Sequence, residues 1–182
     1  MNYHMIRTDD MLNGDGLRVI IFLSGCEHHC HNCHNPETWD VNSGITFTPE
    51  ATKEIISELN KDHISGITLS GGDPLHEENL EDVYKLLKKV RETYPSKSIW
   101  VYTGYEWEHI TKLIKDISPE AIKINKANSL RIEIIKLCDV IVDGKYIEEL
   151  ADVNFPWCGS TNQRVIDVKK TLEEGKIILL NK

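Results

Sequence analysis

The chain has 182 residues, of which 40% are hydrophobic and 27% are charged, and its formal net charge at pH 7 is -8. This length and composition suit a single domain over residues 1–182 with a hydrophobic core of its own. The negative charge disfavours nucleic acids and anionic membranes as partners, because both bind to basic surfaces.

The hydropathy pattern indicates neither membrane insertion nor export. No apolar stretch approaches the ~18 residues that a membrane-spanning helix needs. Residues 1–10 lack the basic and then apolar pattern of a signal peptide. We therefore expect a protein without membrane contact in the cytoplasm, where cysteine thiols stay reduced.

Short apolar runs alternate with amphipathic stretches, which predicts βα units and a parallel sheet. Caps and apolar periodicity place the elements along the chain. In chain order we expect a strand at 17–23, a helix from Pro49 to about Asn60 capped by Thr48, a strand at 67–69, a helix with an apolar face at Leu80, Val83, Leu87 and Val90, a strand at 98–103, a helix at 106–115, a helix capped by Asn128 and ending at Leu137, a strand at 140–142, and late strands at 165–168 and 177–180.

A polar or glycine-rich motif follows each of the first four strands, at residues 26–33, 71–74, 103–104 and 143–145. Ligands of parallel α/β sheets bind at the carboxyl ends of the strands, so we expect these four motifs to line one opening. The sequence has too few βα units for a closed eight-stranded barrel. We therefore predict an α/β fold that forms a partial, open (β/α) TIM-like barrel.

Three of the five cysteines, Cys26, Cys30 and Cys33, form a C-x3-C-x2-C cluster within eight residues. An odd number of cysteines with one tight cluster argues against a disulfide framework and for a metal site. Three thiolates can bind three irons of a 4Fe–4S cluster, whereas such clusters usually have four cysteine ligands. The fourth iron would stay open, as catalytic metals generally keep one position for substrate. Cys138 and Cys158 are expected to be a core thiol and a surface or loop thiol.

A structural zinc site is the alternative for this cluster, with His29, His31 or His34 as the fourth ligand. Zinc sites more often combine paired C-x2-C elements, or one such pair with a later cysteine or histidine pair. The sequence contains no second paired half. The spacing thus favours iron–sulfur, while a zinc-binding adaptor without catalysis stays open.

The C-x3-C-x2-C motif after a strand resembles that of the radical S-adenosylmethionine (SAM) superfamily. The segment Ser70 to Pro74, Ser-Gly-Gly-Asp-Pro, resembles its GGE-type motif, with Asp73 in place of the commoner glutamate. The resemblance implies a barrel of the radical SAM type in which SAM chelates the open iron of one 4Fe–4S cluster. It also implies that Gly71, Gly72, Asp73 and Pro74 meet the SAM amino group, since glycine permits close backbone approach and oxygens accept from an ammonium.

The resemblance extends the expected SAM site to Thr103, Asn35 and Lys145. Many members of the superfamily have an aromatic residue where this chain has Asn32, and that residue helps to pack the adenine. Adenine packing must then come from elsewhere, such as His34 or the backbone. The roles of Arg18 and Arg164 stay open between solvated ion pairs and contacts with a ligand or partner.

Residues 13–18 and 33–39 look like those of the glycyl-radical-enzyme activases, and residues 101–105, 142–146 and 159–164 resemble the branch that acts on anaerobic (class III) ribonucleoside-triphosphate reductase. The resemblance implies reductive cleavage of SAM to a 5′-deoxyadenosyl radical, which forms a glycyl radical on the glycyl radical subunit of the reductase. A low-potential reductant such as flavodoxin would supply the electron. An activase of the pyruvate formate-lyase type is the alternative among enzymes.

Overall fold

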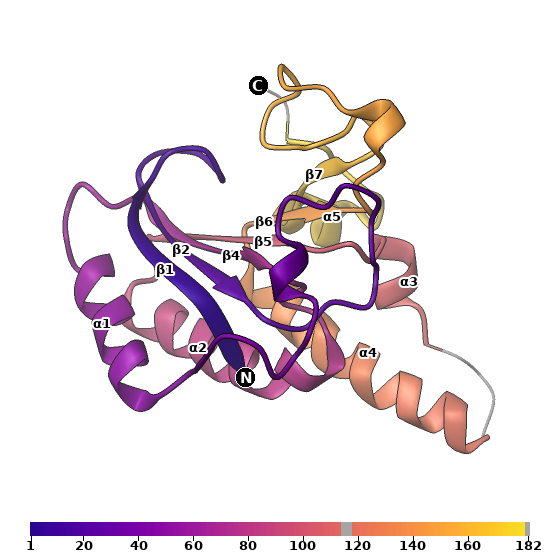
Figure 1. Ribbon diagram of the computed structural model, residues 1–182, viewed down its shortest axis with the longest axis horizontal. Helices are drawn as coiled ribbons and strands as arrows, with labels where there is room; N and C mark the ends of the chain where they lie inside the picture. The colour runs from indigo at the N-terminus through magenta and orange to yellow at the C-terminus, as the bar shows by residue number, and fades with distance from the viewer. Residues whose placement is uncertain (114–117, 181–182) are drawn as a thin grey trace.

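The computed structural model describes residues 1–113 and 118–180, and at its centre lies a sheet with the strand order β3-β1-β2-β4-β5-β6-β7 (Figure 1). The middle strands β2, β4, β5 and β6 are parallel, while β1, β3 and β7 run antiparallel to their neighbours. The strands are β1 (Asn2–Asp10), β2 (Arg18–Leu23), β3 (Ile45–Thr46), β4 (Gly66–Gly71), β5 (Ser98–Tyr102), β6 (Val140–Asp143) and β7 (Arg164–Asp167).

This topology confirms the α/β class and the parallel centre of the sheet. The four parallel strands lie where the first four apolar runs predicted strands, and their carboxyl ends face the same way. In the described part of the chain the edge strands β3 and β7 do not pair with each other, so the sheet is open. Its description as a TIM-like barrel remains a prediction.

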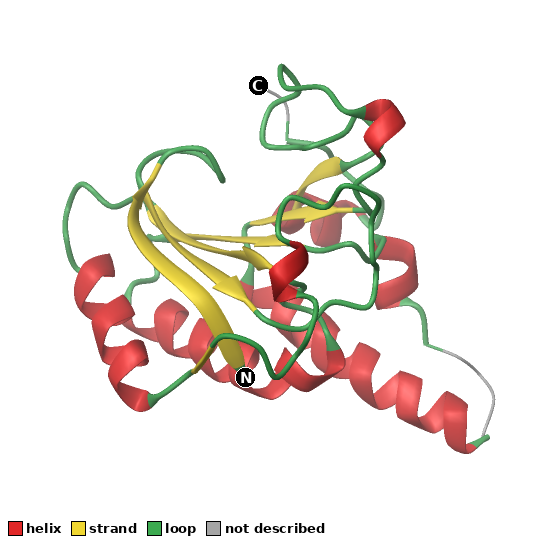
Figure 2. Cartoon of the chain, viewed as in Figure 1, coloured by secondary structure: helices red, strands yellow, loops and turns green. Residues whose placement is uncertain are grey.

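Helices cover one face of the sheet, and long loops lie on the other side (Figure 2). The first long helix begins as its cap predicts, because the Thr48 side chain accepts a hydrogen bond from the Ala51 amide. No described helix combines the length and the apolar character needed to cross a bilayer. The helices are α1 (Pro49–Leu59), α2 (Leu80–Thr93), α3 (Trp107–Thr111), α4 (Pro119–Leu137) and α5 (Val168–Glu174), with short 3-10 turns η1 (Pro36–Thr38), η2 (Glu77–Asn79) and η3 (Glu148–Leu150).

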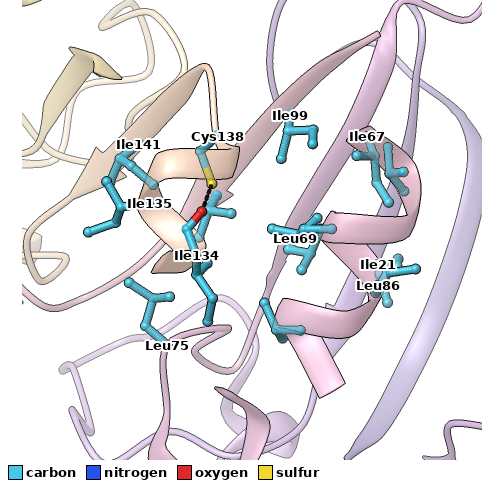
Figure 3. Close-up of a cluster of buried hydrophobic side chains, with 14 of the residues drawn as sticks. Ile21, Ile67, Leu69, Leu75, Leu86, Ile99, Ile134, Ile135, Cys138 and Ile141 are labelled. Carbon is cyan, nitrogen blue, oxygen red and sulfur yellow. Dashed lines mark hydrogen bonds between the residues drawn. The ribbon is translucent and has the colours of Figure 1, made fainter. Parts of the chain in front are cut away.

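The sheet face that carries the helices is apolar. Ile21, Leu69, Ile99 and Ile141 come from the four parallel strands and are 0% exposed. They belong to one cluster with side chains of α2 and α4, such as Leu86 (Figure 3). Side chains alternate across a strand, so this one face supplies the core while the other face remains for different contacts.

Cys138 joins this core just after α4. Its buried thiol donates a hydrogen bond to the carbonyl oxygen of Ile134 at 3.2 Å (Figure 3). Burial raises the pKa of Cys138 well above its usual range, so the thiol stays protonated. The expected core thiol is therefore confirmed.

The opposite face of the sheet is polar and aromatic at its amino-terminal end. Arg18 is buried there, and its Nε donates to Thr68 Oγ1 at 2.7 Å. Its guanidinium lies 5.3 Å from the ring centre of Trp100 and donates to the backbone oxygens of Asp15 and Ile67. Arg18 thus holds neighbouring strands and the preceding loop together, and it is neither a solvated ion pair nor part of the cavity described below.

Two helix predictions were wrong in their bounds. Helix α4 begins at Pro119 after the N-cap Ser118, well before the predicted start at Asn128. The Asn128 side-chain amide instead donates to two backbone oxygens at and just beyond the end of α3. The helix expected at 106–115 is shorter, since α3 ends at Thr111, and part of that range lies outside the described residues.

The predictions for the carboxyl-terminal strands were also partly wrong. The strand expected at 165–168 ends at Asp167, whose side chain caps the first turn of α5 and so turns the chain into a helix. Residues 177–180 form a single bridge through Leu179 and no strand. Strands β1 and β3 were not predicted, because their side chains are mostly half-buried or exposed and show no apolar run.

Candidate functional site

A cavity of about 400 Å³ opens at the carboxyl ends of the parallel strands. This volume lies within the usual range of ~300–1,000 Å³ for ligand pockets. Each of the four motifs that follow the strands contributes to its wall, so their expected convergence is confirmed. The residues of these strand ends that line the cavity are Cys26, Cys30, Cys33, Ser70, Gly71, Gly72, Tyr102, Thr103, Gly104 and Gly144.

The three clustered cysteines lie on a loop that follows β2 and is tied back to a later turn. Gly25 donates its amide to the Thr38 carbonyl at 2.8 Å, and Cys26 donates to the Trp39 carbonyl at 3.0 Å. All three cysteines are free and half-buried. Burial raises the pKa of Cys26 to about 12 and also raises the pKa of Cys30. A metal would therefore have to displace protons from these thiols.

The donor set fits a cluster of several irons. Among residues 1–113 and 118–180, no three His, Cys, Asp or Glu side chains converge on a point where one metal ion would sit. In a 4Fe–4S cubane each cysteine binds a different iron, so three separate thiols can share one cluster. Three thiols on one cavity wall suit that arrangement.

Asp73 fastens the cysteine loop to two neighbouring strand ends. Its buried carboxylate pairs with His28 Nε2 at 2.7 Å and accepts from the Thr103 hydroxyl at 2.9 and 3.0 Å. It also accepts from the amides of Leu75 at 2.8 Å and Gly104 at 3.0 Å. Both carboxylate oxygens are occupied, and Asp73 does not line the cavity. The resemblance implied contact with SAM, but the structure gives this side chain a role behind the wall.

Two glycines allow the cysteine loop to lie directly on the strand ends. A Cβ on Gly72 would lie 2.7 Å from the carbonyl oxygen of Gly25, next to Cys26. A Cβ on Gly104 would lie 2.3 Å from the ring of His28. Both positions therefore exclude any side chain, and the reason is contact with the cysteine loop.

A second set of contacts fastens the same loop from the outside. The Tyr105 hydroxyl donates to the Glu27 carboxylate, and the Tyr105 ring packs edge-on against His28. The Arg131 guanidinium lies 4.4 Å from the centre of the Tyr105 ring and donates to the Leu75 carbonyl. Sequence reasoning missed His28, Tyr105 and Arg131. The sequence gave a signal for two of them: His28 stands between two cysteines, and Tyr105 ends the 101–105 segment.

The far wall of the cavity is the loop between β6 and β7, and its 159–164 motif holds it in place. Gln163 accepts from the Gly159 amide at 2.9 Å and donates to the Gly144 carbonyl at 2.9 Å. Asn162 donates to the Lys145 carbonyl at 2.8 Å. This motif, one of the three segments that resemble the reductase-activating branch, therefore closes the loop onto the end of β6.

Arg164 completes the fastening of the far wall. It pairs with the buried Asp143 at 2.5 Å and with Glu108 at 2.7 Å. The guanidinium lowers the pKa of Glu108 to about 2. Arg164 does not line the main cavity. Its role, which the sequence left open, is that of a cation in an ion-pair network of the described structure.

Of the remaining predicted site residues, some line the cavity and others lie outside it. Asn35 and Thr103 line the cavity, whereas Pro74 is buried outside its wall and Lys145 is exposed. Asn32 is exposed and donates to Glu148 at 2.5 Å. His34, which the resemblance suggested for adenine packing, lines the wall with its ring 5.4 Å from that of Tyr146. The half-buried Cys158, expected to be a surface or loop thiol, also lines it.

One buried polar atom in this wall has no protein partner among the described residues. It is the hydroxyl of Tyr102, at the end of β5. Buried hydroxyls almost always bond to protein, ordered water or a ligand. Burial raises the pKa of Tyr102 far above its usual range, so the hydroxyl keeps its proton.

Comparisons with known proteins agree with these features. Over residues 12–166 the chain matches the family described as "4Fe-4S single cluster domain". It is 41% identical over 167 residues to the anaerobic ribonucleoside-triphosphate reductase-activating protein of Escherichia coli (strain K12), covering 91% of this chain and 97% of that protein. Proteins of the same name from Enterobacteria phage T4 and Vibrio cholerae are 40% and 39% identical over 165 residues; they cover 91% and 90% of this chain, and 93% and 96% of their own lengths. The family match spans the three cysteines and all four strand-end motifs.

Proposed function

The chain belongs to the 4Fe-4S single cluster domain family and to the anaerobic ribonucleoside-triphosphate reductase-activating proteins, and we propose that it is a radical SAM activase that installs the glycyl radical of such a reductase. One observation carries the proposal: the three thiols share a single cavity with the glycine-rich end of β4. This combination supplies both halves of the expected site, ligands for a cluster and a close-approach surface for a small molecule.

When bound, a reduced 4Fe–4S cluster would supply one electron for the cleavage of SAM to methionine and a 5′-deoxyadenosyl radical, which would take one hydrogen atom from a glycine Cα of the reductase. Cys26, Cys30 and Cys33 would hold three irons through their thiolates. The Asp73–His28 contact and the Tyr105–Glu27 contact keep the cysteine loop on the strand ends.

The SAM site in this proposal uses the cavity wall. Gly71 and Gly72 offer backbone oxygens to the SAM ammonium, while Asn35 and Thr103 supply polar side chains on the same wall. Asp73 and Pro74 support the strand end from behind. Lys145 would reach the SAM carboxylate only from outside, since its side chain is exposed.

The proposal also includes an electron donor, a cellular compartment and an entry route for the protein substrate. A low-potential donor such as flavodoxin would reduce the cluster, and the cytoplasm is the proposed compartment. The open sheet would serve as a partial barrel of the radical SAM type. Its open side leaves room for a protein segment as substrate, and the partner would complete the exclusion of water.

The test is anaerobic reconstitution with iron, sulfide, SAM and a reductant, with and without an anaerobic ribonucleoside-triphosphate reductase. We expect about four irons per chain. We also expect a glycine-centred radical on the reductase, seen as a doublet by electron paramagnetic resonance. Pyruvate formate-lyase in place of the reductase should give no radical. A radical on formate-lyase alone would reassign the branch, and a colourless zinc-loaded protein would overturn the chemistry.

A further inference from the structure

Exposed apolar side chains gather at the mouth of the cavity. Leu12 is 78% exposed and Val153 is 99% exposed, and both line the cavity together with the less exposed Phe155. Met11, next in the chain to Leu12, is 72% exposed. We define the three cavity-lining residues Leu12, Val153 and Phe155 as the apolar rim, with Met11 beside it.

The rim comes from two loops at different parts of the sheet. Met11 and Leu12 follow β1, while Val153 and Phe155 belong to the loop between β6 and β7. Figure 1 shows both loops on the same side of the sheet, away from α1, α2 and α4. Single exposed apolar residues are ordinary on protein surfaces, but a group that surrounds one opening is typical of a binding site.

The backbone of both rim loops is held in place although the side chains are free in solvent. Asp10 accepts hydrogen bonds from the amides of Leu12 at 3.1 Å and Asn13 at 2.8 Å. A bridge between Ala151 and Ser160 closes the base of the other loop. The rim is therefore presented by fixed turns, which lowers the entropy lost when a partner binds.

We propose that the apolar rim is the docking surface for the glycine-bearing segment of the anaerobic ribonucleoside-triphosphate reductase; this inference rests on the function proposed above. The glycine Cα must come into van der Waals contact with a radical formed inside the cavity, so its segment has to enter through this mouth. A partner seated on apolar side chains also expels water from the opening, which protects a reactive radical.

The test measures binding of the cluster-loaded protein to the reductase under anaerobic conditions, by calorimetry, for Leu12→Asp, Val153→Asp and the double variant. A charge in the centre of an apolar contact should weaken binding about tenfold for each single variant, and more for the double variant. The yield of glycyl radical should fall in parallel. Iron content should stay at the wild-type value, because neither side chain is an iron ligand.

Ile122→Asp is the matched control. Ile122 is 59% exposed on α4 and does not line the cavity, so this variant should bind the reductase like the wild type. Wild-type affinity in the double variant would overturn the rim proposal while leaving the activase function intact. Equal weakening by Ile122→Asp would overturn it too, since docking would then not be specific to the rim. A wild-type protein that cleaves SAM but neither binds nor activates the reductase would overturn both proposals.

Discussion

The two walls of the cavity are built in opposite ways. The wall formed by the cysteine loop is fastened by buried polar groups, above all the Asp73 carboxylate with its partners His28, Thr103 and Gly104. The wall formed by the loop between β6 and β7 is fastened at its base by Gln163 and meets the cysteine loop through the Asn32–Glu148 contact, and it exposes Val153 to solvent. The first wall is thus held by a buried carboxylate with several partners, and the second leaves apolar surface uncovered.

This difference separates two tasks that one site has to perform. A cofactor needs ligands at fixed positions, and buried hydrogen-bond networks give a unique geometry. A protein substrate must arrive and leave, and an exposed apolar surface on fixed turns allows contact without prior closure. The cysteine wall is therefore the part that should work alone, while the far wall should matter only when the partner is present.

The largest effect should come from removing an iron ligand from the first wall. Cys30→Ala should lose the 4Fe–4S cluster and all SAM cleavage, and the same holds for Cys26 and Cys33. Cys158→Ala is the matched control, because Cys158 lies in the same cavity but on the far wall. It should keep about four irons per chain by chemical assay. Normal iron content in Cys30→Ala, or its loss in Cys158→Ala, would contradict the assignment.

Asp73→Ala should have the next largest effect, and it should act on folding. It leaves several buried donors without a partner, which costs about 3–5 kcal/mol of unfolding free energy. Urea unfolding of the protein without metal measures this loss directly. If Asp73 instead served only to bind the SAM ammonium, the free energy of unfolding would stay unchanged and only SAM affinity would fall.

Gly72→Ala should lower iron content as well as SAM affinity. Its new Cβ would push on the Gly25 carbonyl at 2.7 Å and so displace the backbone next to Cys26. A site in which Gly72 touches SAM alone would predict full iron content with weaker SAM binding. Iron assay and calorimetry with SAM on the same preparation distinguish the two.

Gln163→Ala should produce a smaller change, confined to the far wall. Its side chain makes three hydrogen bonds to backbone groups, to Gly159, Ser160 and Gly144, so its loss should cost about 1–2 kcal/mol of stability. We expect a lower yield of glycyl radical on the reductase at unchanged iron content. A drop in iron content equal to that of the cysteine variants would show that the two walls are not separable.

The smallest effect should be the pH dependence of the Glu108–Arg164 pair. The folded-state pKa of Glu108 is lowered to about 2, so its stabilisation is present above the unfolded pKa near 4.5 and is lost as the pH falls from there toward 2. The pair is largely exposed, and solvent screening limits it to about 0.5 kcal/mol. The difference in unfolding free energy between wild type and Glu108→Gln should therefore fade between pH 4.5 and 2. A difference that stays constant down to pH 2 would contradict the sign.

Local sequence patterns predicted much of this structure. The apolar runs located β2, β4, β5 and β6, and Thr48 with Pro49 located the start of α1, because strand burial and helix capping depend on neighbours in sequence. Asn128 misled because its side chain satisfies distant backbone oxygens near α3, a contact that no local rule contains. Asp167 ended a strand where the apolar pattern continued, since its cap on α5 outweighed that pattern.

The candidate site likewise contains residues that local sequence patterns predicted and residues that only the folded chain brings together. The spacing of the three cysteines predicted a metal site, and the resemblance pointed to Gly71 and Gly72; the structure places all five on one cavity. The partners of Asp73 were not predicted, because His28 and Gly104 meet it only after three strand ends come together. The rim was invisible for the same reason: Leu12 and Val153 are far apart in the chain and become one surface only through the sheet.

The most direct test of the account is the electron paramagnetic resonance spectrum of the reduced, cluster-loaded protein before and after SAM is added. The cysteine wall supplies only three thiolates, so one iron should be free to take the amino and carboxylate groups of SAM, and the spectrum should change on addition. Cys158→Ala should give the same change, because the fourth thiol of the cavity takes no part. A spectrum that is identical with and without SAM, in protein with a full complement of iron, would contradict the central claim that this wall is built for a cluster with one open iron.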